Sequence, residues 1–371
     1  MKTIAGAYSS AKIFTDNIEE YAIAQIQMIC DNEAAKGTKI CIMPDVHPGK
    51  VGPVGLSMTV GQRILPNLIG IDIGCGMSMI QIKDRKIEYQ KLDTVIRDKI
   101  PAGFQSRKKA HHRSEEFDFS RLICSPHINE KRAVLSLGTL GGGNHFIEID
   151  RDKDGDFYVI VHSGSRHLGV EVTEYYLKEG QKCLKDQGLQ VPYGLTWLEG
   201  TLREEYLHDL MVVQEYAALN REIILGELEK AMKWKAKSFR TCVHNYIADD
   251  GEQLILRKGA ISAGKKEDLI IPINMRDGIL LGVGLGNEEW NCSAPHGSGR
   301  LLKRSDVEKQ YTVSDFKKSM KGIHCTCIGK DTLDEAPFAY RGLEEIRDMI
   351  GDTVEIQKIL RPLYNFKAGG K

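Results

Sequence analysis

Two side chains in one short segment could hold a metal ion together. Asp72 and Cys75 stand three residues apart in Ile71-Asp-Ile-Gly-Cys-Gly-Met77, where glycines let the backbone turn so that both face one point. A thiolate and a carboxylate bind divalent metals well. The spacing alone is equally compatible with a buried structural cysteine beside a surface aspartate.

Three histidines extend this set of candidate ligands. His145 follows three consecutive glycines and an asparagine, His162 ends an apolar run, and His244 lies close after a cysteine. A single histidine is more often a hydrogen-bonded core or surface residue than a ligand. Together with Asp72 and Cys75, however, the histidines form a five-ligand set. It is enough for one crowded metal site or for two sites that share the thiolate.

Other polar groups beside these ligands could bind phosphate. The run Gly138-Thr-Leu-Gly-Gly-Gly-Asn-His-Phe-Ile-Glu148 has three adjacent glycines, which permit backbone N–H groups to point into one concavity. Asn144 and Glu148 add an amide and a carboxylate to it. Arg166 follows His162 by four residues, and its guanidinium could grip a phosphate through two hydrogen bonds.

The segment Ala294-Pro-His-Gly-Ser-Gly-Arg300 is the best candidate for covalent chemistry. Glycines on both sides of Ser298 keep the loop open, and Arg300 is placed to meet an oxyanion. Imidazole is neutral at pH 7 because its reference pKa is about 6.5. His296 could therefore attack a phosphorus atom without a separate base and form a phosphoramidate. The alternative is a turn that only joins two strands.

Helices and strands must alternate to bring these groups together. Apolar residues at helical spacing predict a helix between residues 16 and 36 and a long core-facing helix over 203–235. Short apolar runs predict strands at 39–43, 157–161 and 253–256. Polar, reactive side chains follow strand after strand, so we expect a mixed α/β fold.

Three further segments have competing interpretations. The strand at 39–43 is expected to end at Pro44 and to deliver Asp45 into a loop. His324-Cys-Thr-Cys327 could suggest a second metal site, but strand alternation would point both thiols into a core, and we favour that interpretation. The basic run 97–113 could follow a nucleic-acid backbone, although acidic residues follow at once and a solvated loop is the commoner outcome.

Composition excludes several classes of protein. The 371 residues carry 51 Lys+Arg against 51 Asp+Glu, so no net field attracts nucleic acid or an anionic membrane. We find no uncharged apolar stretch long enough to span a membrane and no apolar leader at the N-terminus. Nine cysteines, an odd number, favour reduced thiols and a cytoplasmic location. Without repeats or linkers, we expect one domain over residues 1–371.

Taken in order, the motifs resemble those of the RNA-splicing ligase RtcB family, from about residue 40 to the C-terminus. The segments that carry the resemblance are Met43-Pro-Asp-Val-His-Pro-Gly49, Asp72-Ile-Gly-Cys-Gly-Met77, Leu137-Gly-Thr-Leu-Gly-Gly-Gly-Asn-His-Phe-Ile-Glu148, His162-Ser-Gly-Ser-Arg166, His244-Asn-Tyr246, Arg257-Lys-Gly-Ala260 and His296-Gly-Ser-Gly-Arg300. The resemblance implies a single RtcB-like domain, with central β-sheets flanked by helices around a metal-lined cleft.

It also implies a GTP- and Mn2+-dependent RNA ligase that joins a 3′-phosphate or 2′,3′-cyclic phosphate end to a 5′-hydroxyl end. His296 would take GMP from GTP, the guanylate would pass to the RNA 3′-phosphate, and the 5′-hydroxyl would displace GMP. Two Mn2+ ions would be shared, with Cys75 bridging them, among Asp72, Cys75, His145, His162 and His244. A thiolate with imidazoles prefers Zn2+ by raw affinity, so the Mn2+ assignment rests on the resemblance.

The resemblance assigns further contacts. Those to the nucleotide would come from Asn144, Glu148, Lys258, Asn274, Tyr340 and Lys367. Those to phosphate or RNA would come from Arg166, Arg300 and Asp45. The loop Pro272-Ile-Asn-Met-Arg276 departs from the usual Pro-Gly-Ser-Met-Gly and lacks two glycines and a hydroxyl that would help to hold the nucleotide, so the sequence leaves the strictness for GTP open.

Two other functions fit parts of the pattern. A metal-dependent cyclic phosphodiesterase would keep the fold and the metals and would not need GTP. A non-catalytic RNA-binding protein would bind RNA without turnover. RNA is the expected partner in each case, and the family also allows an archease-like activator. The pattern does not separate tRNA splicing from RNA repair, and it does not set the oligomeric state.

Overall fold

Two β-sheets form the framework of the chain in the computed structural model, which describes residues 2–251 and 253–369. The first sheet is antiparallel except for the parallel pair β2 and β3. Its six strands are, in pairing order, β1 Lys2–Ala5, β2 Ser10–Ile13, β3 Ile40–His47, β4 Val54–Thr59, β10 Leu254–Lys258 and β9 Asn245–Asp249.

The second sheet has seven antiparallel strands. In pairing order they are β12 Asp268–Asn274, β13 Gly278–Gly284, β15 Val354–Lys367, β6 Phe146–Arg151, β7 Phe157–Ser163, β5 Gly76–Ile82 and β8 Ala236–Val243. A small pair, β11 (Ala260–Ser262) with β14 (Ser293–Pro295), links the sheets, because β11 contacts both β4 and β8.

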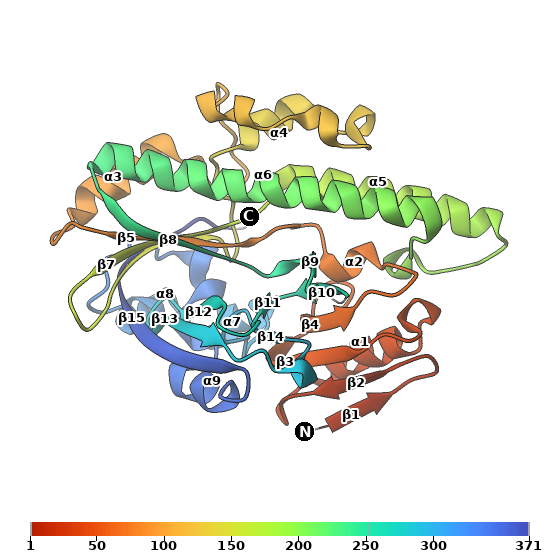
Figure 1. Cartoon of the computed structure of the whole chain (residues 1–371). Coiled ribbons are helices and arrows are strands. Elements are labelled where there is room, and N and C mark those ends of the chain that lie inside the picture. Colours follow the sequence, from red (N-terminus) through yellow and green to blue (C-terminus); the bar gives the residue numbers. More distant parts are fainter. Residues whose placement is uncertain (1, 252, 370–371) are drawn as a thin grey trace.

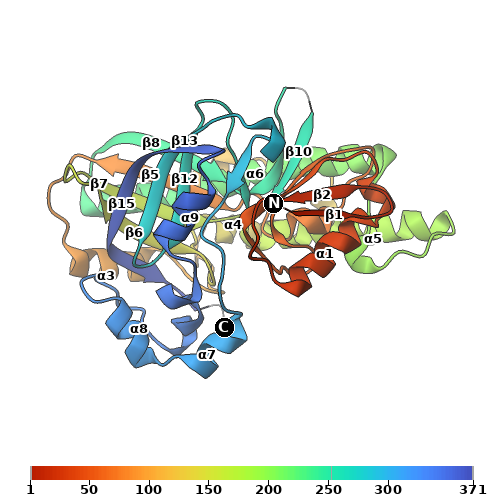
Figure 2. The ribbon, with the colours of Figure 1, turned by 90° about the horizontal axis from the view of Figure 1, so that it is seen from below.

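Nine α-helices are described, and the two longest lie side by side across one side of the molecule (Figure 1). Their bounds are α1 Glu20–Cys30, α2 Pro66–Ile69, α3 Tyr89–Lys99, α4 Glu130–Ser136, α5 Arg166–Asp186, α6 Gly200–Met232, α7 Arg304–Gln310, α8 Val313–Ser319 and α9 Leu343–Met349. Helix α6 packs against β5 and β7 of one sheet and β9 of the other. Figure 2 shows α7 and α8 together, away from the β1–β2 end.

The seven-stranded sheet is covered on both faces. Along β7, Val159 and Val161 belong to the apolar cluster shared with α3 and α6, whereas Ile160 belongs to the cluster shared with α9. Since side chains alternate along a strand, a strand covered on both sides must be apolar throughout. This explains why the apolar run that predicted the strand is continuous.

The mixed α/β fold predicted from the sequence is confirmed, with small shifts in its elements. The long helix predicted at 203–235 is α6. It begins at Gly200 and ends at Met232, because Lys233 adopts a left-handed conformation. Strand β3 does not stop at Pro44 as expected but continues to His47. The pairing register between β3 and β4 shifts between Ile42 and His47, so the missing N–H of Pro44 falls in an irregular part of the ladder.

The strand expected at His324–Cys327 is not formed, but Cys325 does pack against a core, the apolar cluster that contains Val307 and Phe316. Among the described residues this segment makes one isolated bridge, between His324 and Tyr364, instead of a strand. Cys325 and Cys327 are partly exposed, and their sulfur atoms lie 3.3 Å apart. The two thiols therefore lie together, as predicted, and only the strand that was expected to place them is wrong.

Candidate active site

Five predicted side chains meet in one buried cluster with two overlapping groups of candidate ligands. Cys75, His162 and His244 form one group, and Asp72, Cys75 and His145 form the other. The Cys75 sulfur lies 3.3 Å from His162 Nε2 and 3.4 Å from His145 Nε2. His162 Nε2 is 3.2 Å from His244 Nε2, and His145 Nε2 is 3.0 Å from Asp72 Oδ2. Cys75 is therefore common to both groups.

Adjacent strands bring these ligands together. In the order β6-β7-β5-β8, Met77 lies opposite His162, and Gly76 lies opposite Val243, the residue before His244. His244 also donates its backbone N–H to the Cys75 carbonyl at 2.9 Å. Gly74, with φ +69°, makes the turn, and a Cβ there would lie 2.8 Å from the Ala217 Cβ of α6. This turn, at which the sequence predicted a need for glycine, therefore has no room for a Cβ.

The chemistry of this cluster fits a divalent metal. His162 donates Nδ1–H to the Asn144 carbonyl at 3.0 Å, which leaves the lone pair of Nε2 facing the cluster. Burial lowers the pKa of both His162 and His244 well below the usual value, so both rings are neutral donors. Burial, followed by the charge of Asp72, raises the pKa of the Cys75 thiol. A bound cation would favour the thiolate.

Helix α6 braces both ligand-bearing turns from behind. Arg221 is fully buried and donates from Nη1 to the carbonyls of Gly74, at 2.7 Å, and Ser163, at 3.0 Å. The preceding Asn220 accepts the Gly138 N–H at 2.7 Å and donates to the Gly164 carbonyl at 3.1 Å. Neither residue was predicted, because a polar pair in a helical stripe does not reveal what it contacts.

His296 stands next to this cluster with one nitrogen occupied. Its Nδ1 lies 2.7 Å from Oδ2 of the fully buried Asp45, and its ring centroid is 4.9 Å from that of His244. The Asp45 carboxylate accepts the Nδ1 proton, so Nε2 keeps a free lone pair. Gly299 allows this approach, since a Cβ there would lie 2.5 Å from the Asp45 carbonyl oxygen. Asp45, predicted to contact phosphate, is thus buried behind the imidazole.

A second buried cluster surrounds Glu335. It accepts hydrogen bonds from Lys367 Nζ and the Tyr340 hydroxyl, each at 2.6 Å, and forms ion pairs with Arg300 and Arg304. Burial alone would raise the pKa of Glu335, but Lys367, Arg304 and Arg300 outweigh it and lower that pKa. Glu335 was not predicted. Its only signal is its place five residues before Tyr340, and nothing in the sequence distinguishes it from Asp334.

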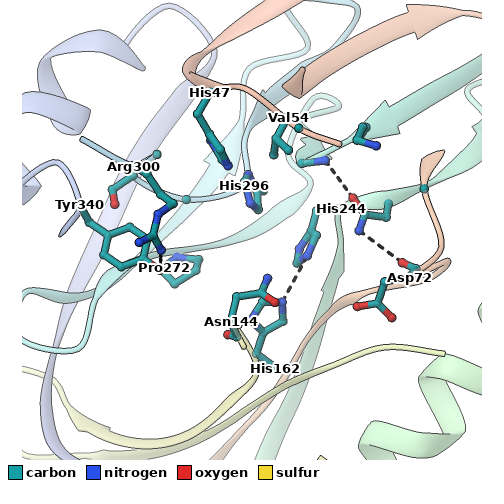
Figure 3. A pocket seen from close by; sticks show the side chains of 18 of the residues that line it. His47, Val54, Asp72, Asn144, His162, His244, Pro272, His296, Arg300 and Tyr340 are labelled. Atoms are coloured by element: carbon teal, nitrogen blue, oxygen red, sulfur yellow. Dashed lines mark hydrogen bonds between the residues drawn. The ribbon is translucent and has the colours of Figure 1, made fainter. Parts of the chain in front are cut away.

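One cavity of about 520 Å³ joins the two clusters. Figure 3 shows Arg300 and Tyr340 on one side of His296 and Asp72 on the other. His47, which was not predicted, also lines the cavity, and burial lowers its pKa to about 4. The site therefore offers neutral imidazoles near its centre.

Four other predicted residues lie around this cavity. Glu148 is buried beside Asp150 and accepts from Asn365, and burial raises its pKa to about 7. Asn274 uses its side chain within its own turn, where it bonds Arg276 N–H and Asp277.

Asn144 lines the cavity, as does Lys258, whose ammonium donates to the Asn67 carbonyl. Arg166 does not line it, and its guanidinium donates to Thr139 and Gly103 instead. The structure thus brings Asn144, Glu148 and Lys258 to the cavity wall and leaves Arg166 outside it.

Comparison with known proteins points in one direction. The family model described as tRNA-splicing ligase RtcB matches residues 31–127 and 124–368. An RNA-splicing ligase RtcB1 of Escherichia coli (strain ATCC 25922) is 30% identical over 366 residues, covering 88% of this chain and 90% of that protein. The RNA-splicing ligase RtcB of Escherichia coli K12 is 29% identical with the same coverage. A tRNA-splicing ligase RtcB of Pyrobaculum aerophilum is 23% identical over 86% of this chain and 85% of its own length.

Proposed function

The chain belongs to the tRNA-splicing ligase RtcB family, and on that premise we propose that it joins RNA ends through a guanylated His296. The substrates are GTP, an RNA 3′-phosphate or 2′,3′-cyclic phosphate end, and a 5′-hydroxyl end. The observation that carries the proposal is the free Nε2 of His296, which Asp45 orients beside the Cys75 cluster. An imidazole whose Nδ1–H is held by a carboxylate is oriented to act as a nucleophile through Nε2.

The steps follow from the need for a leaving group. His296 Nε2 attacks the α-phosphorus of GTP, and pyrophosphate departs. Where the RNA ends in a 2′,3′-cyclic phosphate, water first breaks the P–O2′ bond and leaves a 3′-phosphate and a 2′-hydroxyl. An oxygen of the RNA 3′-phosphate then displaces the imidazole, and the RNA end becomes activated by GMP. The 5′-hydroxyl attacks the 3′-phosphorus and expels GMP, so that a phosphodiester forms. When bound by Asp72, Cys75, His145, His162 and His244, two Mn2+ ions would supply positive charge to the phosphoryl oxygens.

The Glu335 cluster supports the assignment of the nucleotide end. Tyr340 and Arg300 present a ring and a guanidinium to the cavity, with the Arg300 carbon 4.8 Å from the ring centroid. Glu335 holds Tyr340 and Lys367 in place through hydrogen bonds. A stack of this kind suits a purine base, and the fixed polar groups beside it would read the base edge. Guanine is the base that we assign to it.

A ligation assay tests the proposal. Two labelled RNA fragments, one ending in a 2′,3′-cyclic phosphate and one beginning with a 5′-hydroxyl, are incubated with GTP and Mn2+. We expect a joined product with the wild type and with His208→Ala, a matched change in α6 whose ring bonds the Arg121 carbonyl. We expect none with His296→Ala. Opening of the cyclic phosphate without GTP and without joining would instead identify a phosphodiesterase, and RNA binding without turnover a non-catalytic protein.

A further inference from the structure

Part of the cavity is not accounted for by the guanine end or the candidate metal ligands. We call this part the Tyr193 lobe, and it is lined by Lys50, Val51, Asn67, Tyr193, Gly194 and Lys258. These residues come from the segment after β3, helix α2, the turn between α5 and α6, and strand β10. These four elements enclose space beside the GTP site that an RNA end could occupy.

Lys258 gives this lobe a buried positive charge. Its side chain is 9% exposed, and its ammonium donates to the Asn67 carbonyl at 3.1 Å. Over residues 2–251 and 253–369 it has no carboxylate partner. Burial lowers the pKa of Lys258 to about 8. Because a buried charge without a counter-ion is costly, an anion in the lobe would relieve that cost.

A second lysine stands at the rim of the lobe. Lys50 is exposed, in the glycine-containing segment Pro48–Gly52 that follows β3. Within the part of the chain that the structure describes, it forms no ion pair. A phosphate entering the lobe would thus meet a free cation at the mouth and another at the wall.

Tyr193 adds an exposed aromatic ring to the same rim. The residue is 54% exposed, yet its turn is firmly held. Leu195 N–H donates to the Pro192 carbonyl at 2.8 Å, and the buried Thr196 hydroxyl donates to the Tyr193 carbonyl at 2.8 Å. An exposed ring on a rigid backbone is the platform on which an unpaired base stacks.

Asn67 ties the ring and the buried cation together. Its carbonyl accepts from Lys258, and its side-chain amide donates to the Gly194 carbonyl at 3.2 Å. Val51 packs beside Gly194, with Val51 Cγ1 3.5 Å from where a Cβ would stand. The stacking surface and the ammonium therefore lie on two sides of one asparagine, as the base and the phosphate of one nucleotide require.

Resting on the proposed function, we propose that the Tyr193 lobe binds the 3′-terminal nucleotide of the RNA. Its phosphate lies between Lys50 and Lys258, which we thereby assign to the RNA instead of GTP, and its base stacks on Tyr193. The 3′ end fits better than the 5′ end because it carries a terminal phosphate, whereas a 5′-hydroxyl end offers none. The guanine end of the cavity lies at Glu335 and Tyr340, so the two nucleotides do not compete for one surface.

Binding of a fluorescent RNA tests this proposal in the full-length protein. The probe is a short single strand with 2-aminopurine as its last base and a 3′-phosphate. We expect the fluorescence to be quenched on binding to the wild type and to Tyr193→Phe. For Tyr193→Ala we expect affinity to fall by about 5- to 150-fold, since a stacked base contributes about 1–3 kcal/mol. The matched control is Phe239→Ala, an exposed aromatic residue (51% exposed) on β8, which should bind like the wild type.

Further arms separate the sources of the signal. A 3′-hydroxyl strand should bind more weakly than the 3′-phosphate strand, and Lys50→Ala should reduce that difference. Equal affinity of Tyr193→Ala and the wild type, or equal quenching when 2-aminopurine stands at a 5′-hydroxyl end, would overturn the proposal. Labelling of each variant by radioactive GTP is measured in parallel. If the wild type takes no label, the proposed guanylation is refuted. If labelling is normal and Tyr193→Ala binds RNA as the wild type does, only the proposed role of the Tyr193 lobe is refuted.

Discussion

At the scale of single residues, the site depends on buried groups whose partners fix their state. Asp45 is fully buried, and one of its oxygens accepts the Nδ1 proton of His296. The carboxylate therefore selects the tautomer whose lone pair lies on Nε2, and it would stabilise the charge that builds on the ring when Nε2 bonds to phosphorus. Glu335 has a similar holding role at the other end of the cavity.

Replacing Asp45→Asn should slow the labelling of the protein by GTP about 1,000-fold. The amide keeps the shape of the carboxylate, but it neither enforces the tautomer nor balances the charge on the imidazole. Single-turnover labelling with radioactive GTP measures the rate, with His296→Ala as the zero level. Labelling of Asp45→Asn at the wild-type rate would show that Asp45 has no such role.

Glu335 should make the protein less stable in acid. Its pKa is lowered in the folded protein, so it stabilises the fold above its ordinary pKa of about 4.3 and loses that contribution as pH falls below it. Glu335→Gln should cost about 3–5 kcal/mol in unfolding free energy at pH 7, because Lys367 and Arg300 lose their counter-ion. Urea unfolding from pH 7 to pH 3 measures it. A gap between wild type and variant that does not narrow in acid would contradict this role.

At the scale of elements, α6 connects the core to the candidate metal cluster. Its apolar stripe packs on the sheets, while Arg221 holds the turns that carry Cys75 and His162 through the Gly74 and Ser163 carbonyls. One guanidinium nitrogen, Nη1, thus bonds both turns and ties the ligands of two strands together. Arg221 would therefore orient the metal ligands without binding the metal itself.

Arg221→Met should weaken metal binding about 10- to 100-fold, since the two ligand-bearing turns would no longer be held together. Titration calorimetry with Mn2+ gives the affinity, and circular dichroism checks the fold. The matched control is Arg240→Met on β8, which removes a partly exposed ion pair with Asp268 of β12 and should bind Mn2+ normally. Unchanged Mn2+ affinity in Arg221→Met would contradict the bracing.

The sequence predicted elements with strong apolar periodicity and missed those shaped by contacts. Strand β7 and helix α6 were predicted because their patterns are long and regular. Helix α5 was not, since Gly169 and Gly180 interrupt its pattern. A Cβ at Gly180 would lie 2.6 Å from Leu198, so this glycine serves packing between the helix and a distant loop. Contacts of that kind are invisible in one sequence.

In the candidate site, too, residues in recognisable motifs could be predicted, whereas residues defined by distant contacts could not. The side chains of the candidate metal cluster and His296 could be singled out because reactive residue types recur in glycine-rich motifs, and the structure brings them together. Glu335 and Arg221 were not found, because their roles depend on which distant groups the fold places against them. A glutamate in a short turn or an arginine in a helix has many unremarkable uses.

At the scale of the whole molecule, the cavity is lined by residues of both sheets, by the loop that follows β14 and by Arg304 of α7. Helix α6 packs on both sheets, so we propose that residues 1–371 form one domain. No helix among residues 2–251 and 253–369 is long and apolar enough to cross a membrane. The reaction that we propose would use side chains from both sheets and from the loop that carries His296.

If residues 1–371 form one domain around the candidate metal cluster, the protein should unfold in one transition. Bound Mn2+ should raise the temperature of that transition. Adding Mn2+ at about 100 times its Kd should stabilise the fold by about 2.7 kcal/mol, by mass action. Differential scanning calorimetry measures this. Cys75→Ser should lose much of the effect, whereas Cys183→Ser, which changes an exposed thiol on α5, should keep it. Two transitions, of which only one moves with Mn2+, would contradict the single domain.

The central claim is that His296 becomes covalently joined to GMP. The protein is incubated with radioactive GTP and Mn2+, digested, and the labelled peptide is sequenced by mass spectrometry. We predict one acid-labile GMP adduct on His296, with none when ATP replaces GTP and none in His296→Ala. An adduct on another residue, or label that persists in His296→Ala, would contradict the account.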